Sequence, residues 1–180
     1  QNPPVNMQYI TDIQLLNTLS KPKILNKPET LITYPEKTIS FEFKEYIPNT
    51  IISSNPEELI AWVEKEKRAI LKSIHGYGGQ QVIFVDKDHP EKTLDFAEQF
   101  KHVIAQEFLP NISLGDKRVL TVGNKIVGAL RRTPKTGSIL ANMCQGGSAS
   151  ICSLTPKEEE ICQKLVKWCE KHGIMFSGID

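Results

Sequence analysis

Two short apolar runs that flank a glycine-rich turn constrain the fold of this chain more than any other stretch. Ala69–Leu71 and Val82–Val85 have the apolar, partly β-branched character of strands, which predicts a β-hairpin. The turn between them contains three glycines: Gly76, Gly78 and Gly79. Glycine has no Cβ and adopts positive φ readily, so backbone N–H groups in such a turn can converge on an anion. Lys72 adds a positive charge beside the turn.

The glycine spacing by itself is more often that of a tight turn without a ligand than that of a phosphate loop. Two other phosphate-binding patterns are excluded. The chain has no Gly-x-x-x-x-Gly-Lys-Ser/Thr, and the turn leads into a second strand-like run, whereas a dinucleotide fingerprint needs a helix there. The turn therefore predicts a phosphate site only together with other residues.

Length and charge narrow the classes of function. A chain of 180 residues can bury a core as one domain or as two small lobes. Its 22 basic residues are balanced by 21 acidic ones without a basic block, which argues against a nucleic-acid surface. No apolar stretch approaches the ~20 residues of a membrane span, and no leader precedes the first expected helix. Since the sequence begins with Gln1 and stops at Asp180, a removed leader or further domains stay open.

The four cysteines favour buried thiols over a metal site. Cys162 and Cys169 are seven residues apart on a helical pattern, and no cysteine has Cys-x-x-Cys spacing or a histidine at zinc-finger spacing. The remaining two are Cys144 and Cys152. We expect a reducing, cytoplasmic compartment.

Periodicity predicts interleaved helices and strands. Helices are expected near residues 7–19, 56–65, 91–100 and 156–172, with a further helix after the turn at 26–29. Strands are expected at residues 23–25, 48–53, 69–71, 82–85, 103–109, 118–122, 125–130 and 174–180. Residues 30–47 fit either type, and the long segment 133–150 is a candidate mobile loop over a site. Because tight hairpins are present, the predicted class is α+β with largely antiparallel sheets.

A series of short motifs follows in order along the chain. They are Asn2-Pro3-Pro4 with Met7 and Tyr9, Asn26-Lys27-Pro28, Pro35-Glu36-Lys37, Ile70-Leu71-Lys72, Gly76-Tyr77-Gly78-Gly79, Ala105-Gln106-Glu107-Phe108-Leu109-Pro110, Gly115-Asp116-Lys117-Arg118, Asn142 with Gly146-Gly147, and Phe176-Ser177-Gly178-Ile179-Asp180. As an ordered set they resemble the ATP-grasp ligases, most closely the bacterial-type glutathione synthetases, over essentially the whole chain.

The resemblance implies an ATP-grasp fold, in which two α+β lobes with largely antiparallel sheets grip a nucleotide, and a chain incomplete at both ends. Residues 1–34 would be the end of a preceding region and a linker. Residues 35–109 would be the first lobe, with its core at 50–105 and a glycine lid at 76–79. Residues 110–180 would be the second lobe, truncated before its last metal-binding strand.

The resemblance also implies nucleotide-binding residues. Lys37 and Lys72 would contact the phosphates. Four residues would cover the phosphates as the lid: Gly76, Tyr77, Gly78 and Gly79. Four more would form a hinge whose backbone reads the adenine edge: Gln106, Glu107, Phe108 and Leu109. Within the hinge, Glu107 would accept a hydrogen bond from the exocyclic amine, and Asp116 would contact ribose.

Further implied roles concern the reaction. Arg118 and Arg132 would face the acyl phosphate and the transferred γ-phosphate, with Arg131 as the alternative to Arg132. Asp180 would be the first carboxylate for Mg²⁺, or for Mn²⁺ in its place. Three residues would belong to the substrate loop: Asn142, Gly146 and Gly147.

The implied reaction is ATP-dependent ligation of γ-glutamylcysteine to glycine through an acyl phosphate, giving glutathione, ADP and phosphate. Its partners would be these small molecules and a second copy of the chain. Three departures from the pattern bear on this. Leu140 stands where the family has an arginine, Cys144-Gln145 replaces small residues, and the chain stops before the Glu-x-Asn motif of the metal site. An ATP-grasp ligase for another acyl donor and amine, and a nucleotide-binding module without catalysis, therefore stay open.

Overall fold

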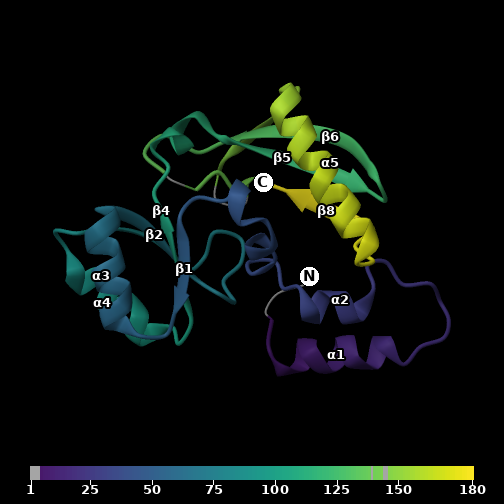
Figure 1. The fold of residues 1–180 in the computed structure, drawn as a ribbon, viewed down its shortest axis with the longest axis horizontal. Helices are drawn as coiled ribbons and strands as arrows, with labels where there is room; N and C mark the ends of the chain where they lie inside the picture. The colour runs from purple at the N-terminus through teal and green to yellow at the C-terminus, as the bar shows by residue number, and fades with distance from the viewer. Residues whose placement is uncertain (1–4, 139, 144–145) are drawn as a thin grey trace. The chain divides into compact units, whose positions relative to one another are not determined.

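The computed structural model describes residues 5–138, 140–143 and 146–180 and divides the chain into two compact units. One unit is the contiguous stretch Lys37–Pro110, here called the hairpin unit. The other, here called the split unit, joins the residues before Lys37 to the residues after Pro110. Figure 1 shows the elements of each. The expected lobes are residues 35–109 and 110–180. The split unit differs from the second of these, because it also includes the residues before Lys37.

The hairpin unit is a four-stranded antiparallel sheet in the order β1-β4-β2-β3, with two helices on one face (Figure 1). Its elements are the 3₁₀ helix η1 (Ile39–Tyr46), β1 (Thr50–Ser53), α3 (Pro56–Glu66), β2 (Arg68–Ser73), β3 (Val82–Asp86), α4 (Pro90–Gln99) and β4 (Val103–Glu107). The pairing of β2 with β3, from Arg68↔Asp86 to Lys72↔Val82, confirms the hairpin around the glycine turn.

Alternation of side chains along the strands gives this sheet two different faces. Ala69 and Leu71 of β2 are fully buried against the helices. The rest of that cluster is Leu59, Val63, Val85, Phe96, Val103 and Ala105. Lys72 directly follows Leu71 and is therefore on the opposite face. α3 begins where the sequence predicts, because the side chain of Asn55 accepts hydrogen bonds from the backbone of Glu57 and Glu58.

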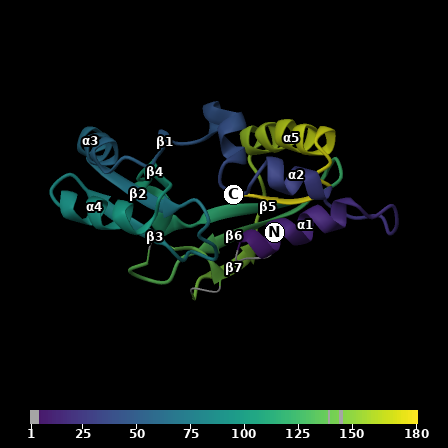
Figure 2. The same ribbon diagram turned by 90° about the horizontal axis from the view of Figure 1, so that it is seen from below.

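The split unit is built on a second four-stranded antiparallel sheet, in the order β7-β6-β5-β8. Its elements are α1 (Met7–Asn17), α2 (Pro28–Thr33), the 3₁₀ helix η2 (Pro110–Leu114, whose first residue belongs to the other unit), β5 (Asp116–Val122), β6 (Lys125–Thr133), β7 (Ser148–Ile151), α5 (Pro156–Lys171) and β8 (Phe176–Ile179). α5 lies across one face of the sheet, where Cys162 packs with Val119 and Ala129 (Figures 1 and 2). The predicted hairpin at 118–130 is confirmed as β5 and β6.

The segment after α1 is attached to the end of α5 and the start of β8. The side-chain oxygen of Asn26 accepts from the backbone N–H groups of Met175 and Phe176 over 2.7 and 2.8 Å, and its amide nitrogen donates to the carbonyl of Phe176 over 2.9 Å. Thr30 donates its hydroxyl to the carbonyl of His172. The ring of Tyr34 packs edge-on against Trp168, with 4.8 Å between centroids. Residues 26–34 are thus part of the split unit's packing.

The predicted α+β class with antiparallel sheets is confirmed, but some local predictions are wrong. Residues 23–25 form no strand: the segment pairs with neither sheet, and Leu25 is exposed. Residues 30–47, which the sequence left open, contain the end of α2 and the 3₁₀ helix η1. The end of the 133–150 segment is the edge strand β7. The motif at 2–4 and the pair Cys144-Gln145 lie outside the described residues.

Two further predictions concern the cysteines and membranes. Cys162 and Cys169 are buried thiols, as predicted, and burial raises the pKa of each. Within the described ranges, no helix has both the length and the apolar character needed to cross a bilayer.

Candidate functional site

A chain of hydrogen bonds fixes Lys72 on the face of the hairpin unit's sheet opposite to α3 and α4. The ammonium of Lys72 donates to the side-chain oxygen of Gln106 over 2.7 Å, and the amide nitrogen of Gln106 donates to the hydroxyl of Thr50 over 3.0 Å. Thr50 in turn donates to the carbonyl of Pro48 over 2.7 Å. Because lysine only donates and the proton of Thr50 goes to Pro48, the direction of the Gln106 amide is set at both ends.

The glycine turn needs its glycines for steric reasons. A Cβ on Gly76 would lie 2.9 Å from the carbonyl oxygen of Gln80. Gly78 and Gly79 have φ of 58° and 78°, the left-handed region that glycine occupies at low cost. The ammonium of Lys37 donates to the carbonyl of Gly76. Within this unit the structure therefore brings the predicted phosphate-binding Lys37 to the predicted lid.

The predicted hinge continues from the end of β4. The backbone N–H of Glu107 donates to the carbonyl of Asn49 over 2.9 Å, and that of Phe108 donates to the carbonyl of Arg68 over 3.3 Å. The ring of Phe108 meets Phe84 edge-on and lies 5.4 Å below the guanidinium of Arg68. The side chains of Glu107 and Leu109, on either side of Phe108, are exposed. Gln106, in contrast, points its side chain to Lys72.

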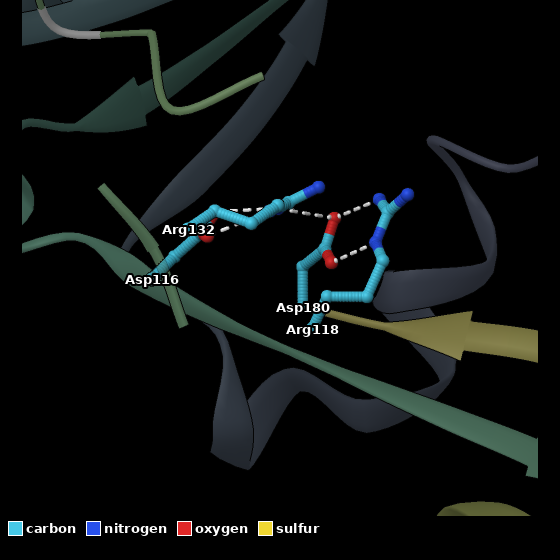
Figure 3. Close-up of polar contacts among 4 residues, drawn as sticks. All are labelled: Asp116, Arg118, Arg132 and Asp180. Atoms are coloured by element: carbon cyan, nitrogen blue, oxygen red, sulfur yellow. Dashed lines mark hydrogen bonds and ion pairs between the residues drawn. The ribbon is translucent and has the colours of Figure 1, made fainter. Parts of the chain in front are cut away.

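Four charged side chains in the split unit form a chain of alternating charge (Figure 3). Arg132 donates from Nε and Nη2 to both carboxylate oxygens of Asp116, over 2.8 and 2.5 Å. Its Nη2 also lies 3.1 Å from Oδ2 of Asp180. Asp180 accepts a second bidentate pair of hydrogen bonds from Arg118, over 2.6 and 2.5 Å. The structure thus brings together two predicted catalytic arginines, the predicted metal carboxylate and the predicted ribose contact.

Strand register explains why these residues meet. Asp116 and Arg132 are direct partners in the β5–β6 pairing, and Asp180 follows β8, which pairs with the other edge of β5. Arg118 lies two residues after Asp116 and therefore on the same face. Arg131, the alternative to Arg132, donates instead to the carbonyl of Leu114 over 3.2 Å. The register thus assigns Arg132, and not its neighbour, to the cluster.

Hydrogen bonding holds both guanidiniums of the cluster in the charged form. The bonds to Asp180 raise the pKa of Arg118, and the bonds to Asp116 raise the pKa of Arg132, in each case against the opposing effect of burial. The two arginines differ in exposure, because the side chain of Arg118 is 40% exposed and that of Arg132 only 7%. An anionic ligand can therefore reach Arg118 more directly than Arg132.

Mg²⁺ fits the chemistry of this cluster only in part. Magnesium commonly binds one or two protein carboxylates together with phosphate oxygens and water. Asp180 supplies such a carboxylate. Among the residues that the structure describes, however, no three histidine, cysteine, aspartate or glutamate side chains gather as a metal cage.

The predicted substrate-loop residues fold into tight turns. A Cβ on Gly147 would lie 2.6 Å from the carbonyl oxygen of Ala141, and Gly147 donates its N–H to the carbonyl of Asn142 over 3.3 Å. Gly146 has a φ of 87° and donates to the carbonyl of Met143. The backbone N–H of Leu140 donates to the hydroxyl of Ser138 over 3.0 Å.

Sequence reasoning missed one residue of the site. Thr50 fixes Gln106, but a threonine at the start of a strand is ordinary strand composition and carries no separate signal. The bidentate pairing of Asp116 with Arg132 was equally invisible, since it depends on the register of β5 and β6.

Comparison with protein families gives a match over most of the chain. Residues 36–180 match the family described as prokaryotic glutathione synthetase, ATP-grasp domain. The chain is 33% identical over 185 aligned residues to the glutathione synthetase of Bradyrhizobium diazoefficiens, and 32% identical over 187 to that of Prochlorococcus marinus. Each alignment covers 100% of this chain, which spans 59% and 61% of the lengths of these relatives.

Solved structures show the same fold at lower identity. A RiPP-associated ATP-grasp ligase from Chryseobacterium gregarium, solved with ADP and a leader and core peptide, matches with a TM-score of 0.69 at 16% identity, over 94% of this chain and 54% of that one. The D-cycloserine synthetase DcsG matches with a TM-score of 0.69 at 10% identity, over 94% of this chain and 62% of that one. At these identities the comparison shows the ATP-grasp fold alone.

Proposed function

This chain belongs to the prokaryotic glutathione synthetase ATP-grasp family, and from this premise we propose that its protein is an ATP-dependent carboxylate–amine ligase that joins γ-glutamylcysteine to glycine. The observation that carries the proposal is the cluster of Arg118, Arg132, Asp116 and Asp180, which unites on one sheet the side chains that such a reaction needs. The chain spans only part of its relatives' length, so the activity concerns the full-length protein.

Nucleotide binding is assigned to the hairpin unit's cations and glycines. Lys72, held by Gln106, and Lys37, beside the carbonyl of Gly76, bind phosphate oxygens as point charges. The glycine turn offers backbone N–H groups without a Cβ to obstruct them. The hinge at 106–109 binds the adenine edge through its backbone. Exclusion of water by the turn protects an acyl phosphate from hydrolysis.

The split unit's arginines are assigned to the transferred phosphate. Negative charge accumulates on phosphoryl oxygens during transfer and on a tetrahedral oxyanion when the amine attacks, so guanidiniums held in place beforehand stabilise both states. Mg²⁺ bound at Asp180, with phosphate oxygens as its other ligands, would supply further neutralisation of that charge. Asn142, Gly146 and Gly147 are assigned to the acyl donor. We further propose a cytoplasmic location and assembly with a second copy.

One observation favours a second candidate, a ligase of the same fold for another acyl donor and amine. Leu140 occupies the place where the resemblance expects an arginine, and an apolar side chain cannot pair with a substrate carboxylate. The nucleotide-binding residues are the same for both candidates, so only the products distinguish them.

The test is a product screen with the full-length protein, ATP and Mg²⁺. We expect glutathione by mass spectrometry and release of phosphate when γ-glutamylcysteine and glycine are both present. Phosphate release with other acyl donors or amines, and none with this pair, would establish the second candidate. ATP binding without product from any pair would exclude a ligase and leave a nucleotide-binding module.

A further inference from the structure

The pair Asp116–Arg132 is arranged differently from a residue that contacts ribose. Both carboxylate oxygens of Asp116 already accept from Arg132, in the parallel bidentate geometry that is the strongest form of this contact. The two residues are register partners on neighbouring strands. A hydroxyl of ribose would have to use one of the lone pairs that these two bonds leave. The contacts therefore favour a role for Asp116 toward Arg132.

Arg132 is itself poorly placed to meet a substrate. Its side chain is 7% exposed, and two of its nitrogens are engaged by Asp116. Its further contact is with Asp180, 3.1 Å away. Arg132 thus presents a fixed positive charge to the carboxylate that the proposed function gives to Mg²⁺.

Asp180 contacts Arg118 as well as Arg132. Oδ2 of Asp180 is shared by the two arginines, and its two oxygens hold Nε and Nη2 of Arg118 in a second parallel pair (Figure 3). The stem of Arg118 also lies over Gly178, where an added Cβ would meet its Cδ at 3.5 Å. The side chain of Arg118 is more exposed than that of Arg132.

We propose that Asp116 and Arg132 are positioning residues, whose fixed pair on β5 and β6 orients the carboxylate of Asp180 and, through it, the guanidinium of Arg118. Arg118, the more exposed of the two arginines, then contacts the transferred phosphate directly, and Arg132 acts on that phosphate through Asp180. This inference rests on the proposed function for its consequences in catalysis, but the orientation itself is a property of the ligand-free chain.

The first test reads orientation without any activity. In ¹⁵N NMR of the ligand-free protein, we expect hydrogen exchange at Nε of Arg118 and Arg132 to be slow in the wild type, because each Nε donates to a carboxylate. Asp116→Asn removes one charge-assisted bond directly, and we expect exchange at both arginines to accelerate by about tenfold or more. Arg132→Lys, which keeps the charge but not the fork, gives the same acceleration at Arg118. Unchanged exchange at Arg118 in both variants would overturn the proposal.

The matched control is Arg131→Lys, on the same strand next to Arg132. Its side chain contacts Leu114 and not the cluster, so exchange at Arg118 stays as in the wild type. Thermal unfolding of each variant shows whether it folds. If Asp116→Asn does not fold, Arg132→Lys tests the same expectation. Faster hydrogen exchange at Arg118 in Arg131→Lys as well would contradict an orientation of Arg118 by Arg132 through Asp180.

The second test separates positioning from ribose binding in the full-length protein. Asp116→Asn is expected to lower kcat by roughly ten- to a hundredfold while KM for ATP changes by less than about threefold, because the loss concerns Arg118 in the transition state. The preference for ATP over 2′-deoxy-ATP stays as in the wild type. A raised KM with loss of that preference would assign Asp116 to ribose. If the wild type makes no product, the proposed function fails, while the NMR result still decides the orientation.

Discussion

Lys72 and Gln106 are diagonal neighbours on β2 and β4, and the ammonium of Lys72 lies 2.7 Å from the side-chain oxygen of Gln106. Gln106 is neutral, so this contact orients the ammonium without cancelling its charge. Thr50 holds the amide from the other side over 3.0 Å. The end of the glycine hairpin thus carries a cation whose direction is set by the neighbouring strands.

Lys72→Ala tests whether this cation binds phosphate. We expect the affinity for ATP in the presence of Mg²⁺ to fall by about ten- to a hundredfold, since a charge-assisted contact contributes about 1.5–3 kcal/mol. Isothermal titration measures it. Lys65→Ala, an exposed lysine on α3, is the control and keeps wild-type affinity. Equal affinity in wild type and Lys72→Ala would refute the phosphate role.

Gly76→Ala tests the steric need for glycine in the turn. The new Cβ would lie 2.9 Å from the carbonyl oxygen of Gln80, so the turn must shift. We expect a loss of about 1–3 kcal/mol in unfolding free energy by urea titration, together with weaker ATP binding. Gly128→Ala is the matched control, because an added Cβ there meets no atom within 4 Å. A loss as large in Gly128→Ala would show that the clash with the carbonyl of Gln80 is not its cause.

Glu158→Gln tests a pH-dependent contact at the start of α5. The ion pair with Lys117 at 2.6 Å and the bond from the backbone of Thr155 lower the pKa of Glu158 to about 2 from 4.5. A lowered folded-state pKa contributes stability above pH 4.5, and this contribution is lost as the pH falls toward 2. Glutamine keeps the cap but not the charge, and Glu158 is partly exposed, so we expect a loss of about 0.5–1 kcal/mol at pH 7.

The measurement is urea unfolding of the wild type and Glu158→Gln at pH 7 and pH 3. The difference between them should shrink to less than half at pH 3. Glu159→Gln, an exposed neighbour in the same first turn, controls for the helix dipole. A difference that is constant between the two pH values would exclude the ion pair as its cause.

Asn26→Ala tests the attachment of residues 26–34. It removes three hydrogen bonds to Met175 and Phe176, which are worth about 2–3 kcal/mol together at roughly 1 kcal/mol each. Asn26→Asp keeps the oxygen that accepts two of them and should lose less. Asn17→Ala, an exposed asparagine at the end of α1, should be nearly neutral. Equal stability of Asn26→Ala and the wild type would show that water replaces these bonds without cost.

Local patterns predicted most of the elements, because their signals are contained within a few residues. The capping box at Thr155 and Glu158 and the Gly123-Asn124 connection place α5 and the β5–β6 hairpin correctly. The strand expected at 23–25 failed for the opposite reason. Strand composition does not decide whether a partner strand is available. The segment is held instead by the side chain of Asn26, which hydrogen-bonds to the backbone of Met175 and Phe176.

The site was predictable as a set of residues but not as a set of contacts. The ordered motifs named Asp116, Arg118, Arg132 and Asp180 individually. Which arginine pairs with which carboxylate depends on the register between strands that are far apart in sequence, and a single-residue slip would have exchanged Arg131 for Arg132.

The bonds of Asn26 join positions 149 and 150 residues apart, and this separation bears on the order in which the protein folds during its synthesis. The contiguous stretch Lys37–Pro110 has all its strands once it leaves the ribosome. Asn26, in contrast, has no bonding partners until Met175 and the start of β8 are translated, 149 and 150 residues later. Domains that close over such long separations fold slowly. In a nascent chain halted before Met175, we therefore expect residues 37–110 to fold while Asn26 lacks its bonding partners.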